Sequence, residues 1–592
     1  MPSRRLLIAL FASCASFATA FAAAPDGLAL YKSRCAVCHD GKPQTRMPSR
    51  DDLATHSPEA ILKAMVDGPM IQQAAGLTDD ERRAIARFLT SKDFSTGPAR
   101  MLGQCTAAPK PMSLSASDWN GWGNGMNNTR YQPNPGLSAA DVPKLKVKWA
   151  FGFPGLTMAQ GQPTIAGGRV FVGSTAGDFY SLDASSGCLY WTFKAGAQLR
   201  NSATIGKIGS RYIVYFGDGK AIAHALDAET GKPIWQTKIE DFQQARITAS
   251  PVFYDGRLYV AISDLEEPSA MSPTYECCKY TGSVSSLDGE TGKVIWRSPT
   301  IAQPAKPYRT SSTGTQLYGP SGASVWAAPT VDAKRKLVYV GTGNSFTNVN
   351  VDTTNAILAF DLETGKLAWS HQTFEKDDFT MACGPSGKAN CPEDRGPDVD
   401  FGTSPAIRSI GGGKEVLVVG QKSGILWAFD PDNKGAVVWQ TRIGNGGALG
   451  GIEWGHATDD QNAYASISDR PRGPGLISAV NLKTGEKLWT TPTPDTGRPT
   501  FMSSAISAMP GIVFAGAIDS HFRAYDSKTG AIVWDFDAMK PFETVNGIAA
   551  KGGSFDDPGP VIANGMVFTP SGYGMWGGSA GNVLLAFSVD GK

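Results

Sequence analysis

The strongest constraint on the fold is a sequence unit that recurs seven times between residues 183 and 534. In each copy an acidic or amide residue follows a short apolar segment, Thr-Gly or a substitute comes next, and a tryptophan closes the unit. The copies are Asp183…Trp191, Asp227…Trp235, Asp288…Trp296, Asp361…Trp369, Asp430…Trp439, Asn481…Trp489 and Asp526…Trp534. A period of about 40–60 residues is typical of β-propeller blades. We expect these tryptophans to pack between blades.

Two incomplete units flank the seven complete ones. Trp149 has no strands before it, and the stretch Gly565 to Phe587 predicts inner strands without a final tryptophan strand. An N-terminal strand that completes the last blade would leave no exposed sheet edge. The sequence therefore predicts a mainly β protein with an eight-bladed propeller over residues 141–592, a linker over 98–140 and a small all-α domain before it.

The N-terminus has the three parts of a signal peptide. Arg4 and Arg5 are the charged start, Leu6 to Ala12 the apolar core, and Ala20-Phe21-Ala22 a small-x-small cleavage site. We expect residues 1–22 to be removed and the protein to be periplasmic, with no membrane span because the apolar core is too short for one. The formal net charge of +1 predicts no nucleic-acid partner.

A haem-attachment motif, Cys35-x-x-Cys38-His39, follows the predicted signal peptide. Two thiols in this order bond to the vinyl groups of haem c, and the adjacent histidine becomes an iron ligand. Thr78 and Glu81 predict a capping box at the start of a closing helix. Residues 23–97 therefore resemble a class I cytochrome c domain.

In class I cytochromes c the second iron ligand is a methionine before the last helix, and Met70 matches that position best. Met65 and Met47 are the alternatives. Met65 shares the apolar pattern of Ile61 and its neighbours, so we expect it in the core.

The repeat resembles the tryptophan-docking motif of quinoprotein alcohol dehydrogenases, which bind pyrroloquinoline quinone (PQQ). The resemblance covers nearly the whole propeller, and the haem domain in front is similar to the polyvinyl alcohol dehydrogenase (cytochrome) type. The resemblance implies oxidation of secondary alcohols, including those of the polymer, with electrons passing through haem c to an external acceptor such as a soluble cytochrome c. The alternatives are a PQQ enzyme for another alcohol, aldehyde or sugar, and a non-catalytic scaffold of the BamB type.

The resemblance also assigns residues to the cofactor, at the propeller end where inner strands begin and second strands end. It implies calcium ligands at Glu266 and Asn344, whose oxygens suit Ca²⁺. It implies PQQ contacts at Gln160, Arg200, Thr248, Ser263, Trp326, Lys422 and Trp454. Gln160 stands where the family often has Glu, so this position carries no charge.

The family's catalytic base corresponds to Asp400, with Asp398 and Asp378 as nearby alternatives. A base here would take the proton of the substrate hydroxyl. Lys422 corresponds to the cation that bonds the quinone oxygens.

After removal of Cys14 and the haem cysteines, six cysteines remain, which predicts three disulfides in an exported protein. Cys383 and Cys391 are eight residues apart in a Pro/Gly-rich insertion, and we expect them to pair. Cys105 is expected to pair with Cys188. Methanol-type relatives carry an adjacent cysteine pair against the quinone in the second blade. Here the adjacent pair is Cys277-Cys278, in a loop of blade three. Three alternatives remain open for it: a disulfide that reaches the cofactor, a disulfide that staples the loop, or two free thiols.

Overall fold

The computed structural model describes residues 25–40, 48–54, 56–66, 70, 73–92, 94, 103–384, 388–470 and 473–592. The chain divides near residue 97 into a helical unit and a β unit. The predicted signal peptide, residues 1–22, lies outside the described residues, as does Met47. Within the described part of the chain, no helix is long and apolar enough to cross a membrane.

The helical unit packs short helices around one small core. Its helices are α1 (Gly27–Arg34), α2 (Ala36–His39), α3 (Arg50–Ala54), α4 (Pro58–Val66) and α5 (Asp79–Thr90). The core includes Tyr31, Ile61 and Ile85. The predicted capping box is present at the start of α5, where Thr78 and Glu81 bond each other's backbone amides. Met65 is buried in this core, as predicted.

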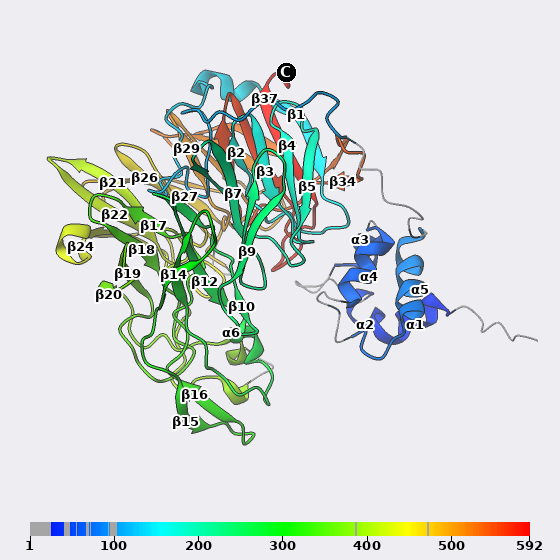
Figure 1. Cartoon of the computed structure of the whole chain (residues 1–592), viewed down its shortest axis with the longest axis horizontal. Helices are drawn as coiled ribbons and strands as arrows, with labels where there is room; N and C mark the ends of the chain where they lie inside the picture. Colours follow the sequence, from blue (N-terminus) through cyan, green and yellow to red (C-terminus); the bar gives the residue numbers. More distant parts are fainter. Residues whose placement is uncertain are drawn as a thin grey trace, which may run out of the picture. The chain divides into compact units, whose positions relative to one another are not determined.

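The β unit is an eight-bladed propeller of four-stranded antiparallel sheets, which confirms the predicted fold (Figure 1). The first four blades are β2–β5 (Thr164–Ala166, Arg169–Gly173, Asp178–Asp183, Leu189–Lys194), β6–β9 (Thr204–Ile208, Arg211–Gly217, Ile222–Asp227, Pro233–Lys238), β11–β14 (Val252–Tyr254, Arg257–Asp264, Ser283–Asp288, Val294–Pro299) and β17–β20 (Thr330–Asp332, Leu337–Gly341, Ala356–Asp361, Leu367–Gln372).

The remaining blades follow the same order. They are β21–β24 (Ala406–Gly411, Lys414–Gly420, Ile425–Asp430, Ala436–Arg442), β25–β28 (Ala457–Thr458, Asn462–Ile467, Leu476–Asn481, Lys487–Pro492), β29–β32 (Ser507–Met509, Ile512–Gly516, His521–Asp526, Ile532–Asp537) and the closing blade β35, β36, β37 and β1 (Val561–Ala563, Met566–Ser571, Val583–Val589, Leu145–Gly152). β1 pairs with β37, so the predicted closure is confirmed.

Tryptophans at the blade ends lock neighbouring blades together. Trp191 packs over Gly231 of the next repeat, where an added Cβ would lie 2.5 Å from the indole ring. Its indole N–H donates to the carbonyl of Ala228, 3.3 Å away. Gly231 also has φ +71°, a conformation that favours glycine. The Asp, Gly and Trp of the repeat thus form one structural unit.

The segment predicted as a linker folds onto the propeller. Trp119 and Arg130 are each at most 1% exposed. Arg130 donates to the carbonyl of Ile506 in blade seven and to Gln162 before blade one. The segment therefore bridges inner strands of distant blades, a set of contacts that follows no repeat pattern.

Small elements extend the third and fourth blades. β10 (Ala245–Arg246) and α6 (Glu266–Ser269) flank the end of β12, and the hairpin β15–β16 (Lys306–Thr310, Gln316–Gly319) projects beyond the blades (Figure 1). A second small hairpin is β33–β34 (Pro541–Phe542, Ala550–Lys551).

Candidate active site

A pocket of about 520 Å³ lies at the propeller end where the inner strands begin. Residues just before inner strands line it, such as Arg200 before β6 and Trp454 before β25. Residues just after second strands join them, such as Lys422 after β22. Of the predicted site residues, Gln160, Arg200, Lys422 and Trp454 line this pocket.

One side of the pocket is a charged group stacked on an indole. Arg200 Nε donates to Asp557 Oδ2 at 2.6 Å, and Gln160 Nε2 donates to the same oxygen at 3.0 Å. The guanidinium lies 4.3 Å from the ring centre of Trp454. Burial raises the pKa of Asp557, and Arg200 opposes that shift. Arg200 is thus held in place on the pocket wall.

Another part of the pocket wall holds a buried lysine beside two carboxylates. Lys422 Nζ lies 2.8 Å from Asp398 Oδ1 and 3.7 Å from Asp400 Oδ2. Burial disfavours the ammonium, but Asp398 and Asp400 outweigh burial and raise the pKa of Lys422, so it is charged. Burial raises the pKa of Asp398 to about 7, although Lys422 opposes the shift. Asp398 and Asp400 therefore both lie at the lysine that the sequence assigned to the quinone.

Trp326 connects this cluster to Trp454. Its indole N–H donates to Asp400 Oδ2 at 3.2 Å, and the two rings lie 4.8 Å apart at 72°. Asp400 Oδ1 accepts the backbone N–H of Asn344 at 2.8 Å. An added Cβ on Gly402 would lie 2.2 Å from the Trp326 ring, so only glycine fits beneath that indole.

Asp377, which sequence reasoning missed, anchors the segment that carries both acids. Its carboxylate accepts the backbone N–H groups of Asp398 and Val399, each at 2.7 Å. Asn355 Nδ2 donates to it at 2.9 Å. The side chain is 2% exposed. Asp377 thus acts on the site through the backbone of Asp398 and Val399.

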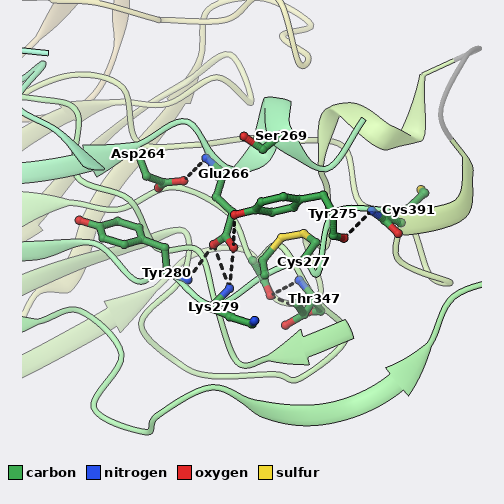
Figure 2. The surroundings of a disulfide bond; sticks show 12 residues. Asp264, Glu266, Ser269, Tyr275, Cys277, Lys279, Tyr280, Thr347 and Cys391 are labelled. Carbon is green, nitrogen blue, oxygen red and sulfur yellow. Dashed lines mark hydrogen bonds between the residues drawn. A yellow bond between two sulfur atoms is a disulfide. The ribbon is translucent and has the colours of Figure 1, made fainter. Parts of the chain in front are cut away.

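The two predicted calcium ligands have protein partners. Figure 2 shows the Glu266 carboxylate accepting the backbone N–H groups of Lys279 and Tyr280 and the hydroxyl of Tyr275. Burial raises the pKa of Glu266 to about 7. Asn344 Nδ2 donates to the carbonyls of Ser345 and Phe379.

Thr248 and Ser263 bond each other, with their hydroxyl oxygens 2.7 Å apart, and are not among the described residues that line the pocket. Asp378 lines a different pocket.

The pocket also holds acids that the sequence analysis did not assign. Glu267 lines it, and burial together with Asp398 raises the pKa of that carboxyl. Burial and Asp556 raise the pKa of Glu453 to about 8. Asp556 accepts the indole N–H of Trp454 at 2.8 Å. These acids could have been found in the sequence from two pairs of adjacent acidic residues, Glu266-Glu267 and Asp556-Asp557. Both pairs stand at the same blade positions as the assigned residues.

The disulfide predictions for Cys383–Cys391 and Cys105–Cys188 are confirmed. Cys277 and Cys278 also form a disulfide (Figure 2). They pack with Leu317 of β16, and the backbone N–H of Cys278 donates to the carbonyl of Tyr318. Neither cysteine is among the described residues that line the pocket, so in this structure the pair staples the loop to the β15–β16 hairpin.

In the helical unit, the haem-motif thiols of Cys35 and Cys38 are unbonded, one half-buried and one exposed. His39 follows them at the end of α2 and is buried. Met70 is half-buried against the helical core. Free thiols with an adjacent histidine fit the thioether attachment of haem c.

Comparisons with known proteins agree with this arrangement. Residues 119–386 match the family model "Glucose/ethanol/alcohol dehydrogenase, beta-propeller domain", residues 22–89 match "Cytochrome C oxidase, cbb3-type, subunit III", and residues 473–592 match "Outer membrane protein assembly factor BamB". The chain is 43% identical to the polyvinylalcohol dehydrogenase of a Pseudomonas sp., covering 96% of this chain and 94% of that one. It is 42% identical to the polyvinylalcohol dehydrogenase of Sphingopyxis sp. (strain 113P3), covering 96% and 93%.

A quinohemoprotein alcohol dehydrogenase of Pseudomonas putida HK5 shares the fold, with a TM-score of 0.62 at 17% identity over 81% of each chain. The propeller pocket and the haem-attachment unit therefore define a PQQ-dependent alcohol dehydrogenase with its own cytochrome c domain. Within that class, the chain belongs to the polyvinylalcohol dehydrogenase family.

Proposed function

We propose that this enzyme oxidises secondary alcohols to ketones, including the repeated alcohols of polyvinyl alcohol, in the periplasm. The observation that carries the proposal is the group of Lys422, Asp398 and Asp400 beside the indole of Trp326. Lys422 and Asp398 put a fixed positive charge and a proton acceptor on the pocket wall. Asp400 and the Trp326 indole lie next to them, although neither is among the described residues that line the pocket. Electrons leave through haem c to an external acceptor such as a soluble cytochrome c.

PQQ, when bound, supplies the two-electron acceptor for the hydrogen on the alcohol carbon. Trp454 lines the pocket and would offer PQQ a flat surface, with the Trp326 ring packed edge-on against it. Arg200 stands at the wall where a carboxylate of PQQ would be recognised. Lys422 would stabilise the carbonyl oxygens of PQQ as they gain electron density. Arg200 already bonds Asp557, so it meets PQQ as part of an ion pair rather than as a lone cation.

Asp400 is the proposed base that takes the proton of the substrate hydroxyl. The Trp326 indole and the Asn344 amide fix its carboxylate, and Lys422 lies near the same oxygen as the indole. Asp398 is the alternative base, since it lines the pocket and Lys422 bonds only one of its oxygens.

Calcium completes the proposal. Glu267, Asp398, Glu453 and Asp556 line the pocket together with the cations Arg200, Arg395, Lys422 and Arg470. The calcium proposal therefore rests on the carboxylates themselves, whose hard oxygens suit a divalent cation. Glu266 and Asn344 remain the proposed ligands, and Glu267 adds a carboxylate next to Glu266 that faces the pocket. Among the described residues, no three acidic, histidine or cysteine side chains form a metal site by themselves, so PQQ oxygens would have to complete the coordination.

Two insertions that reach the pocket support a polymer as the substrate. Residues 264–282 and 374–399 leave the blades at this end, and Glu267, Phe379 and Met381 from these insertions line the pocket. Loops of this kind can wall a groove for a long chain, or close over a small alcohol.

The test compares kcat/KM for polyvinyl alcohol, a short secondary diol and ethanol, with PQQ, Ca²⁺ and an artificial dye acceptor. We expect the polymer and the diol to exceed ethanol. If ethanol is preferred by a wide margin and the polymer is inert, the polymer assignment fails. If alcohol leaves the visible spectrum of the PQQ-loaded haem protein unchanged, electron transfer through haem c fails as well.

A further inference from the structure

A second pocket, of about 240 Å³, lies among the loops of the fourth blade. We call it the blade-four pocket. Eight of the nine described residues that line it are polar or charged, among them Asn350, Thr354, Glu375, Lys376 and Asp378. None of the described residues that line it also lines the catalytic pocket. The two pockets are therefore separate sites on the same propeller.

Asp378 gives the blade-four pocket an unsatisfied hydrogen-bond acceptor. The side chain is 2% exposed. Asn348 Nδ2 donates to its Oδ2 at 2.9 Å, whereas its Oδ1 is buried without a hydrogen-bond partner. Buried polar atoms are nearly always paired, and a carboxylate oxygen can only accept while it is ionised. The oxygen thus calls for a ligand that donates a hydrogen bond.

The wall composition favours a hydroxyl group over a metal ion as that donor. The described residues bring no three metal-ligating side chains together. The wall carries the acids Asp352, Glu375 and Asp378, the positive charge of Lys376, and the neutral groups of Asn350 and Thr354. A hydroxyl can donate to Asp378 and accept from such neighbours at once. A chain that carries many hydroxyls would satisfy several of these groups together.

The two pockets share one wall. Asp378 lines the blade-four pocket, while the next residue, Phe379, and Met381 line the catalytic pocket. Asp378 forms extended bridges with Ser345 and Arg395. Successive side chains of an extended segment point to opposite sides. The segment 378–381 therefore separates the pockets by little more than the thickness of one chain.

We propose that the blade-four pocket binds hydroxyl groups of a long polyhydroxylated substrate whose reacting alcohol occupies the catalytic pocket. This inference rests on the proposed function. Asp378 accepts an O–H of one unit of the substrate chain, while the reacting alcohol of another unit occupies the catalytic pocket on the far side of the segment 378–381. The pocket thereby selects polymers over short alcohols without touching the reacting carbon.

The decisive variant is Asp378→Asn. The asparagine side chain has the same shape, and its amide oxygen can still accept the hydrogen bond from Asn348. An N–H₂ donor then replaces the carboxylate oxygen that has no partner. We expect kcat/KM for polyvinyl alcohol to fall by about tenfold or more, as for loss of a hydrogen bond to a charged group. Values for a short secondary diol should stay within about twofold, because the diol does not span both pockets. Asp394→Asn, an exposed acid on the same insertion, is the matched control.

Equal losses for polymer and diol, or no loss for either, would overturn the inference. A second experiment measures binding of the polymer to PQQ-loaded Asp400→Asn protein and to the double variant that also carries Asp378→Asn. This comparison detects binding at the blade-four pocket independently of turnover. Weaker binding in the double variant supports the inference even if the wild type leaves the polymer unoxidised, a result that would sink the proposed function alone. Loss of one bound calcium per chain in Asp378→Asn protein would show a cation site instead.

Discussion

Replacing Asp377 by asparagine tests whether a residue outside the pocket sets the geometry of the catalytic acids. The carboxylate accepts three hydrogen bonds of 2.7, 2.7 and 2.9 Å. The amide keeps one acceptor oxygen, which can serve Val399 and Asn355. Its N–H₂ group then faces the N–H of Asp398, and that donor loses its partner.

The expected magnitude follows from that single loss. A hydrogen bond to a charged group contributes about 1.5–3 kcal/mol. If the whole amount falls on the positioning of Asp398 and Asp400, kcat decreases by about 10- to 150-fold, since about 1.4 kcal/mol corresponds to tenfold. We expect a smaller effect on Tm than on kcat, because Asp398 and Val399 precede β21 and take no part in the strand pairing of that blade.

The assay measures kcat and KM for a short secondary alcohol with PQQ, Ca²⁺ and a dye acceptor, together with Tm. Asp394→Asn is the control for a lost charge on the same insertion. A kcat within threefold of the wild type would refute the positioning role. So would a loss of activity matched by a large fall in Tm, because that would indicate unfolding.

The other predictions address the base, the haem and the blades. Asp400→Asn should retain PQQ, because Trp326 and Trp454 remain, and should lose about 100-fold or more in turnover; near-normal turnover would move the role to Asp398. Met70→Ala should abolish the weak sulfur-to-iron absorption band and leave the haem covalently attached; survival of the band would assign another ligand. Gly231→Ala should lower the free energy of unfolding by about 1–2 kcal/mol or more, from its left-handed backbone and the Trp191 contact; an unchanged denaturation midpoint would contradict that packing.

The sequence predicted the parts of this molecule that repeat. Trp191 and Gly231 meet through a contact that each blade makes with the next, so one pattern, read seven times, defines the ring. Arg200 and Lys422 were assigned from the resemblance to the quinoprotein family, and the repeated blades bring them to one end of the ring together with Trp454. The outer strand supplied by Leu145–Gly152 could be predicted because the first unit had a tryptophan strand without inner strands, and the last unit had inner strands without a tryptophan strand.

Other features follow no repeat. Arg130 contacts blade seven and the start of blade one from a segment with no strand pattern. Asp377 differs from its neighbour Asp378 only in which way the side chain points, and tertiary contacts decide that. Glu266 was assigned to calcium from its place after a strand, but its carboxylate accepts backbone amides of a loop thirteen and fourteen residues further on.

The closing blade imposes an order on the assembly of this enzyme. Leu145 of β1 pairs with Val589 of β37, so the first propeller strand can pair only after the last strand has been made. Contacts between such distant residues form slowly. Gln160, near the start of the propeller, and Asp556 and Tyr573, near its end, line the same pocket. A complete PQQ pocket therefore exists only once the whole chain has been synthesised, whereas the helical unit, made entirely from the first hundred residues, can fold and receive its haem before the propeller is complete.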